Sequence, residues 1–221
     1  MEDKIKASYR QSKDIYDDVL TQNKWWSRLY IRLFWSGVDD LEIAGKLLSY
    51  IPDDFDGQLL DVPVGTAVFT WQKYLRLNQA SITCLDYSED MLAQASQRFQ
   101  QHQMSHVTTV QGDVGAMAFE NAQFDIVLCM NGFHAFPDKE KAFAEIHRVL
   151  KKNGQLVSCF YISGQSNVTD WLVGKVLSKK GWFTKPFETI DSLKQRLAGH
   201  YDIEAFHVAG AMVYFCARKR D

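Results

Sequence analysis

The chain has 221 residues, 46% hydrophobic and 24% charged, and this ordinary globular mixture excludes a disordered, collagen-like or coiled-coil protein. Its 25 basic residues against 27 acidic ones lack the basic footprint that sequence-independent nucleic-acid binding requires. No apolar run is long enough to predict a membrane span, and the polar N-terminus does not resemble a signal peptide. We therefore expect a cytoplasmic, soluble protein without a nucleic-acid partner. The sequence does not indicate its oligomeric state.

Residues 1–56 are rich in aromatic side chains and predict a helical N-terminal cap. The clearest helix covers residues 39–51, where apolar side chains recur at helical spacing. From residue 57 the pattern changes, so we expect a second domain that extends to residue 221.

Short strands and helices alternate in this second part. Strands are predicted over residues 58–62, 81–86, 107–111, 124–130 and 155–161. Helices are predicted over residues 66–77, from Ser88 to about residue 103, and from Asp138 to the Asn153–Gly154 pair. Such alternation predicts βαβ units, hence a parallel sheet covered on both faces.

The last third of the chain breaks this alternation. A helix over residues 167–180 and an aromatic stretch over residues 182–187 predict an insert, residues 161–188, above the sheet. A helix over residues 189–197 follows. Strands over residues 201–208 and 211–218, joined by Ala209–Gly210, predict a C-terminal antiparallel hairpin.

The four cysteines fit no zinc-binding spacing, so no metal site is expected. Each lies in an apolar run that predicts a strand, and free cysteine is among the most buried residue types. We interpret all four as reduced core residues, namely Cys84, Cys129, Cys159 and Cys216.

Chemistry is expected at the carboxyl ends of the strands, where parallel sheets bind their ligands. The first strand runs into a turn with Gly65, where a ligand can approach the backbone. Asp86 ends the second strand 21 residues later, a spacing typical of an acid that binds the ribose hydroxyls of an adenosine ligand. The alternative is that Asp86 is a turn residue next to the Ser88 cap.

Two further strand ends carry candidate residues. Asp113 can accept a hydrogen bond from an exocyclic amine, with Val114 beside it, although Gly-Asp is also a common turn pair. The fourth strand runs into Asn131 and then His134, which is either a general base or a packed, hydrogen-bonded side chain.

These motifs together resemble the class I S-adenosylmethionine-dependent methyltransferases, in particular the small-molecule branch that includes quinone-biosynthesis enzymes. LLDVPVGTA resembles the first family motif, CLDYSEDML the second, and VQGDVGAMAF the third. The run FDIVLCMNGFHAFPDKEKAFAEIHRVLKKNGQLV resembles the segment from the fourth strand to the fifth. The resemblance implies a Rossmann-like, seven-stranded, mostly parallel sheet with helices on both faces.

The resemblance also implies the cofactor, S-adenosyl-L-methionine, and a small-molecule methyl acceptor. The loop from Asp61 to Ala67 would hold the methionine end of the cofactor, using a helix N-terminus, and Asp86 would bind the ribose. Tyr87 and Met91 would flank the adenine, Asp113 and Val114 would meet its edge. The cofactor-binding residues implied are Asp61, Val62, Pro63, Gly65, Thr66, Asp86, Tyr87, Met91, Asp113, Val114, Met130 and Asn131.

The first motif departs from the family pattern at two positions. Pro63 stands where the first loop glycine is usual, and Ala67 stands where the third is usual. Proline removes an N–H donor, and alanine adds a Cβ where close packing is common. Gly65, the central glycine, remains.

Methyl transfer requires alignment of acceptor and methyl group more than a catalytic side chain. Tyr16, which precedes Asp17 as in a family Tyr-Asp pair that closes over the cofactor, and His134 are the candidate catalytic residues. Five of the six tryptophans lie outside residues 57–160 and predict either a hydrophobic lid or packing within the cap. The predicted acceptor pocket comprises Trp35, Phe133, Trp171 and Trp182.

Two other functions fit parts of the pattern. A pyridine-nucleotide dehydrogenase would also use Asp86, but the first loop lacks the G-x-G-x-x-G sequence of a diphosphate-binding turn. A non-catalytic protein that binds the cofactor or its demethylated product for regulation or scaffolding is the other alternative.

Overall fold

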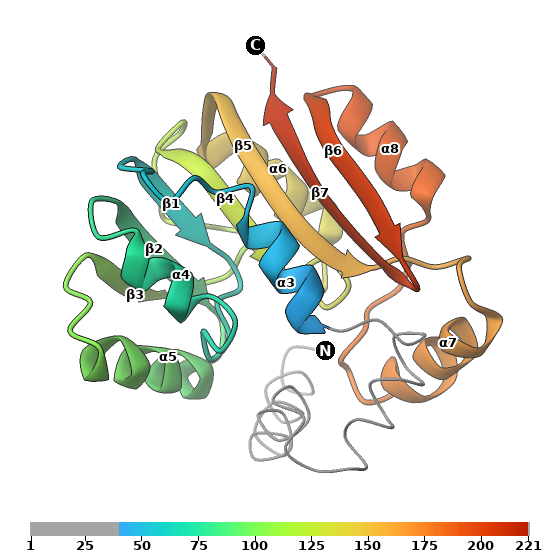
Figure 1. Ribbon diagram of the computed structural model, residues 1–221. Coiled ribbons are helices and arrows are strands. Elements are labelled where there is room, and N and C mark those ends of the chain that lie inside the picture. Colours follow the sequence, from blue (N-terminus) through green and yellow to red (C-terminus); the bar gives the residue numbers. More distant parts are fainter. Residues whose placement is uncertain (1–39, 221) are drawn as a thin grey trace.

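The computed structural model describes residues 40–220 and consists of one seven-stranded sheet between two layers of helices (Figure 1). The strands are β1 (Gln58–Asp61), β2 (Ser81–Asp86), β3 (Val107–Gln111), β4 (Phe124–Met130), β5 (Leu150–Tyr161), β6 (Tyr201–Ala209) and β7 (Met212–Lys219). The helices are α3 (Asp40–Leu48), α4 (Trp71–Arg76), α5 (Glu89–Gln101), α6 (Lys139–Val149), α7 (Asn167–Leu172), the π-helix η1 (Val173–Leu177) and α8 (Ile190–Ala198).

The strands are arranged in the order β3-β2-β1-β4-β5-β7-β6. The first five are parallel, and β7 pairs antiparallel with both β5 and β6. The predicted Rossmann-like fold with a C-terminal antiparallel hairpin is therefore confirmed. The chain moves outward from β1 through β2 to β3 and returns to the other side of β1 as β4, which leaves a crevice at the carboxyl ends of β1 and β4.

Alternation along the strands divides the core into two apolar layers. In β1, Leu59 belongs to the cluster that α3, α4, α5 and η1 cover, whereas Leu60 belongs to the cluster beneath α6 and α8. Successive side chains of a strand point to opposite faces, so a sheet covered on both sides needs near-continuous apolar strands. The four cysteines lie in β2, β4, β5 and β7 and are free and buried, as predicted.

Helix caps match the sequence where a short polar side chain precedes the helix. Ser88 accepts a hydrogen bond from the Met91 N–H, and Asp138 accepts one from the Lys141 N–H at 3.0 Å. Thr189 and Ser192 form a reciprocal capping box at the start of α8. Each bond satisfies a backbone donor that the first helical turn leaves free.

Two predicted boundaries are wrong. The helix predicted from residue 66 begins only at Trp71, because residues 62–70 form successive turns with Gly65 and Ala67 in the left-handed region, at φ +57° and +58°. The helix predicted to end at Asn153–Gly154 ends at Val149, and β5 begins directly afterwards at Leu150. Asn153 instead adopts φ +62° within an irregular part of β5.

The insert is helical as predicted, but its helix changes character. After α7, residues 173–177 continue as a π-helix. The hairpin after α8 turns through Gly210–Ala211, one residue later than the predicted Ala209–Gly210, because Ala209 pairs with Met212. Most of the predicted N-terminal cap, residues 1–39, lies outside the described residues. Among residues 40–220, no helix is both long and apolar enough to cross a bilayer.

Candidate functional site

One cavity opens at the carboxyl ends of β1, β2, β3 and β4, and all of the predicted cofactor-binding residues line it. We call it the strand-end cavity. The space between its lining atoms is about 1290 Å³, open solvent at the mouth included. The further lining residues are Val64, Ala67, Val68, Phe69, Thr70, Leu85, Ser88, Gly112, Ala135, Phe136 and Pro137.

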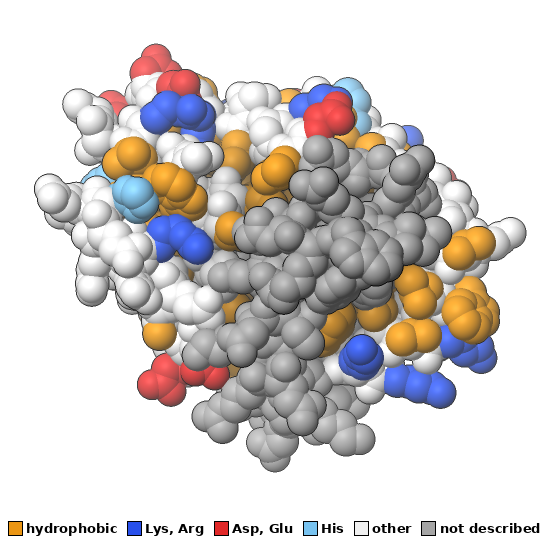
Figure 2. All heavy atoms as spheres, turned by 60° about the horizontal axis from the view of Figure 1, so that its bottom comes forward, with side chains coloured by type: hydrophobic (Ala, Val, Ile, Leu, Met, Phe, Trp, Pro, Cys, Tyr) orange, Lys and Arg blue, Asp and Glu red, His pale blue; other side chains and the backbone are white. Residues whose placement is uncertain are grey.

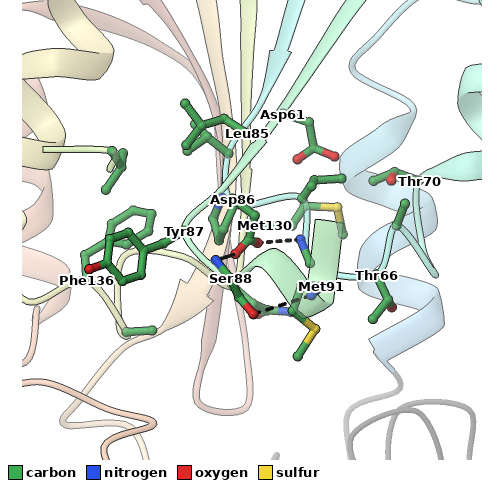
Figure 3. A pocket seen from close by; sticks show the side chains of 18 of the residues that line it. Asp61, Thr66, Thr70, Leu85, Asp86, Tyr87, Ser88, Met91, Met130 and Phe136 are labelled. Carbon is green, nitrogen blue, oxygen red and sulfur yellow. Dashed lines mark hydrogen bonds between the residues drawn. The ribbon is translucent and has the colours of Figure 1, made fainter. Parts of the chain in front are cut away.

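The cavity has an aromatic side and a polar side. Figure 3 shows Tyr87 and Phe136 on one side, with Asp61, Thr66 and Thr70 on the other. Met91, the third residue of α5, lies between them near Asp86. A ligand with a planar ring at one end and charged groups at the other fits this division.

Asp86 connects β2 to the loop that follows β1. Its Oδ2 accepts a hydrogen bond from the Gly65 N–H at 2.8 Å, and its Oδ1 accepts one from the Ser88 N–H at 2.9 Å. Burial raises the pKa of this carboxyl above its usual value, and the backbone donors of Ser88, Gly65 and Tyr87 oppose that shift. A carboxylate has about four acceptor positions, so both oxygens keep capacity for a ligand's hydroxyl groups.

Asp61, at the end of β1, is the second buried acid of the cavity. The Tyr74 hydroxyl donates to its Oδ2 at 2.7 Å, while Oδ1 is buried with no hydrogen-bond partner among the described residues. Burial raises the pKa of Asp61 to about 7, and the nearby Asp86 adds to the shift. The same burial raises the pKa of Tyr74 well above its usual value, so Tyr74 remains a donor.

Asn131 supplies a second unpartnered acceptor. It follows β4 at φ +55°, a region that asparagine tolerates better than most residues, and its N–H donates to the Cys159 carbonyl at 2.7 Å. Its side-chain Oδ1 is buried without a hydrogen-bond partner within residues 40–220. A buried acceptor oxygen without a hydrogen bond destabilises the folded protein by about 1–3 kcal/mol. Asp61 and Asn131 therefore both present acceptors that a cationic ligand group would satisfy.

The loop between β1 and α4 is held by contacts that the sequence did not predict. The Val64 N–H donates to the Leu85 carbonyl at 3.0 Å, and the Arg98 guanidinium donates to the Thr66 carbonyl. α4 starts only at Trp71, five residues later than predicted, so loop residues 62–69 and the N-cap residue Thr70 line the cavity ahead of the helix.

Gly132 is another residue that sequence reasoning missed. A Cβ at this position would lie 2.5 Å from Pro63 Cδ, 2.6 Å from Phe136 Cζ and 2.8 Å from Cys129 Sγ. Pro63 therefore packs against the loop after β4, and the glycine that follows Asn131 was the only sequence signal for this contact. The departure of Pro63 from the family pattern is accommodated there.

His134 does not belong to the lining of the strand-end cavity. Its Nδ1 accepts the Tyr161 N–H at 3.2 Å, and its ring stacks on Phe183 with the centroids 4.3 Å apart. Burial, with the Lys139 charge as a smaller cause, lowers the pKa of His134 to about 3. A buried imidazole with that pKa stays neutral at physiological pH and is a weak base, so the structure favours the packing interpretation.

The structure describes three of the four predicted acceptor-pocket residues, and none of the three lines the strand-end cavity. Phe133 is fully buried and stacks on Phe143 with a centroid distance of 3.8 Å, and Trp182 packs against the core beneath η1. Trp171 on α7 is 61% exposed. Tyr16 and Trp35 lie outside the described residues.

Comparisons with known proteins agree with this fold. Residues 60–158 match the family described as "Methyltransferase domain". A demethylmenaquinone methyltransferase of Deinococcus radiodurans is 35% identical over 114 residues, which cover 52% of this chain and 45% of that protein.

Solved structures share the fold at lower identity. A putative methyltransferase from Bacillus halodurans superposes with a TM-score of 0.67 at 20% identity, covering 83% of this chain and all of that one. A geranyl diphosphate methyltransferase, solved in complex with GPP and sinefungin, gives a TM-score of 0.66 at 12% identity over 79% of this chain and 76% of that one.

The predicted resemblance to class I S-adenosylmethionine-dependent methyltransferases is thereby confirmed over residues 60–158, the part of the chain that matches the methyltransferase-domain family. The chain's matches span about half the length of the curated relatives, between 42% and 48% for the first of them.

Proposed function

We propose that this protein is a methyltransferase that uses S-adenosyl-L-methionine to methylate a small, apolar or aromatic acceptor. The observation that carries the proposal is the strand-end cavity. It gathers every cofactor residue implied by the sequence motifs, from four different strand ends, around two buried carboxyl groups. The matched family and the names of the relatives support the same activity.

The residues present fit this cofactor. The unpartnered oxygens of Asp61 and Asn131 would accept hydrogen bonds from its ammonium group, and Asp86 would accept them from its ribose hydroxyls. Tyr87 and Phe136 offer apolar ring surface to the adenine. A Cβ on Gly65 would meet nothing within 4 Å, so this glycine leaves room for the ligand beside the loop.

When bound, S-adenosylmethionine supplies a methyl group already activated on a sulfonium sulfur. The protein's own part is to hold the acceptor and the cofactor, to orient them toward each other and to exclude water. Orientation alone can lower the activation free energy by about 7–11 kcal/mol. The cavity wall contributes apolar side chains of Val68, Phe69 and Phe136 to that exclusion. No general base is required unless the acceptor must lose a proton near attack.

The proposed class of acceptor follows from the lining residues of the cavity that have no proposed role in cofactor binding. Val68, Phe69, Ala135 and Pro137 are apolar, and none of them carries a charge that would select an ionic substrate. Apolar walls with few polar groups suit a planar, hydrophobic ring. The relatives named demethylmenaquinone methyltransferase point to a quinol-type ring as the first acceptor to test.

Calorimetry with S-adenosylmethionine and with its demethylated product tests the cofactor site. We expect one site in each titration, and Asp86→Ala to weaken binding at least tenfold because charged hydrogen bonds contribute about 1.5–3 kcal/mol. Asp86→Asn keeps the shape and tests the charge alone. Glu120→Ala, which removes an exposed carboxylate that is not part of the lining, should bind as the wild type does. No detectable binding by the wild type would end the proposal.

Release of demethylated product over a panel of acceptors separates an enzyme from a binding protein. Quinol-type rings, other phenols and small amines form the panel, and we expect turnover with the first group. Tight cofactor binding without turnover on any acceptor would favour the non-catalytic alternative.

A further inference from the structure

We propose that the outer face of the α7–η1 segment docks on an anionic lipid surface. The face consists of Val168, Trp171, Lys175 and Lys179, with Lys185 beyond them, and we call it the α7 surface. It forms no part of the strand-end cavity. The inference deepens the proposed function, because an apolar acceptor of the proposed class would partition into such a surface.

The segment from Asn167 to Lys179 has two faces with opposite roles. Thr169, Val173 and Leu177 recur every four residues and are buried against the core. Val168 and Trp171 lie between them on the other side, and their side chains are 69% and 61% exposed. The core is complete without these two apolar side chains, so packing does not account for them.

Positive charge accompanies the exposed apolar groups. Residues 167–187 contain four lysines and one acidic residue, whereas the whole chain has 25 basic and 27 acidic residues. Asp170 turns inward, where its carboxylate accepts hydrogen bonds from the Tyr161 hydroxyl and the Gly164 N–H. Within the described residues, Lys175, Lys179 and Lys185 form no ion pair, so their charge remains available to an anionic partner.

Exposed tryptophan beside lysine is the combination that suits a membrane interface. Indole rings are enriched at the headgroup level, and each lysine near an anionic surface strengthens binding by a factor of about five. Hydrophobic and basic side chains lie together at the right of the face in Figure 2, where α7 and the residues after η1 are found.

The position of the α7 surface links it to the proposed site. α7 follows the carboxyl end of β5, so it lies at the same edge of the sheet as the strand-end cavity (Figure 1). The segment is also anchored to the loop after β4, since the Thr184 N–H donates to the His134 carbonyl at 2.9 Å and Lys139 Nζ donates to the Thr184 carbonyl at 2.7 Å. Docking through α7 would present this edge of the sheet to the lipid.

Co-sedimentation with lipid vesicles tests the proposal. We expect the full-length chain to bind vesicles of phosphatidylcholine mixed with phosphatidylglycerol, and to bind pure phosphatidylcholine far more weakly. Binding should also fall between about 0.1 M and about 1 M salt, where the screening length drops from about 10 Å to about 3 Å.

Two double variants separate the apolar and the ionic contributions. Val168→Ser with Trp171→Ala should weaken vesicle binding at least tenfold, and Lys175→Ala with Lys179→Ala about twentyfold or more with loss of the salt dependence. Leu75→Ala with Lys141→Ala is the matched control, because it removes an exposed apolar side chain and an exposed lysine elsewhere. All three should retain cofactor affinity in the absence of lipid, which distinguishes this proposal from the proposed function.

Failure of the wild type to bind the mixed vesicles would overturn the proposal, as would equal binding by the wild type and the Val168–Trp171 variant. Analytical ultracentrifugation tests whether a second copy of the chain, instead of lipid, binds to the α7 surface. A self-association that Trp171→Ala abolishes would assign the surface to a second copy of the chain and not to lipid.

Discussion

The sequence predicted the residues of the strand-end cavity better than it predicted the positions of residues in the segment between β5 and α8. Every cofactor-binding residue expected at the cavity lines it, whereas Trp171 and Trp182, expected over the acceptor, do not. Residues at the carboxyl ends of parallel strands are placed by the hydrogen-bonded sheet itself. Residues in an insert are positioned by the helix face that buries more apolar surface. The pattern of strands in the sequence does not predict which face that is.

The largest expected effect tests how tightly the cavity side is packed. Gly132→Ala would place a Cβ within 2.8 Å of Pro63, Phe136 and Cys129, so we expect a loss of about 2–3 kcal/mol in unfolding free energy and weaker cofactor binding. Gly174→Ala is the matched control in η1, where a Cβ meets nothing within 4 Å. Chemical denaturation of both variants measures the difference, and equal stabilities would show that the loop after β4 yields more easily than the packing implies.

Trp182→Ala asks whether the insert contributes to binding or only to packing. The ring is half-buried against the core and lies outside the cavity lining, so we expect a loss of about 2 kcal/mol in stability. Cofactor affinity should stay within about twofold of the wild type by calorimetry. A fall in turnover without a fall in stability would instead restore the predicted aromatic lid over the acceptor.

Asp61 makes the cavity sensitive to pH. Its pKa of about 7 means that the carboxyl loses its proton as the pH rises from about 6 to about 8, so affinity for the cofactor's ammonium group should rise about tenfold over that range. Asp61→Asn should bind more weakly and flatten the profile. Titration calorimetry from about pH 6 to about pH 8 measures this change in affinity. If the affinity of Asp61→Asn changed with pH as steeply as that of the wild type, the dependence would belong to another group.

The same carboxyl predicts an opposite effect on stability. Its folded pKa is raised above the unfolded value, so the folded state binds more protons and the unliganded protein loses stability as the pH rises through about 7. Asp61→Asn should therefore be more stable than the wild type at about pH 8, where the buried charge is uncompensated. Thermal unfolding without ligand provides the measurement.

The smallest effects concern the left-handed positions of the first loop. Gly65→Ala forces a Cβ onto a residue at φ +57° and into open space at the cavity, so we expect about 1 kcal/mol of strain and a several-fold weaker cofactor affinity. Ala67→Gly, at φ +58°, removes the equivalent strain and should leave stability unchanged or slightly higher. Lower stability in Gly65→Ala beside unchanged or slightly higher stability in Ala67→Gly is the result to look for in parallel denaturation experiments, with calorimetry for the cofactor affinity of Gly65→Ala.

The sequence alone determined the fold class and twelve of the residues that line the strand-end cavity. Strand runs such as DIVLCM are apolar throughout because both faces of the sheet are covered, and motif spacing placed Asp86 and Asn131 at the strand ends. Caps such as Ser88 and Asp138 are local interactions within one turn, so their prediction needed no tertiary information.

Only the tertiary structure decided the features that depend on distant contacts. Ala67 could not be expected at a positive φ, and its conformation delays α4 until Trp71. The raised pKa of Asp61 arises from burial beneath Tyr74 and beside Asp86, residues 13 and 25 positions away. The orientation of the His134 side chain depends on two distant contacts. The Tyr161 N–H comes from β5, and the Phe183 ring comes from the insert. Burial and long-range hydrogen bonding set these properties, and neither is contained in local residue patterns.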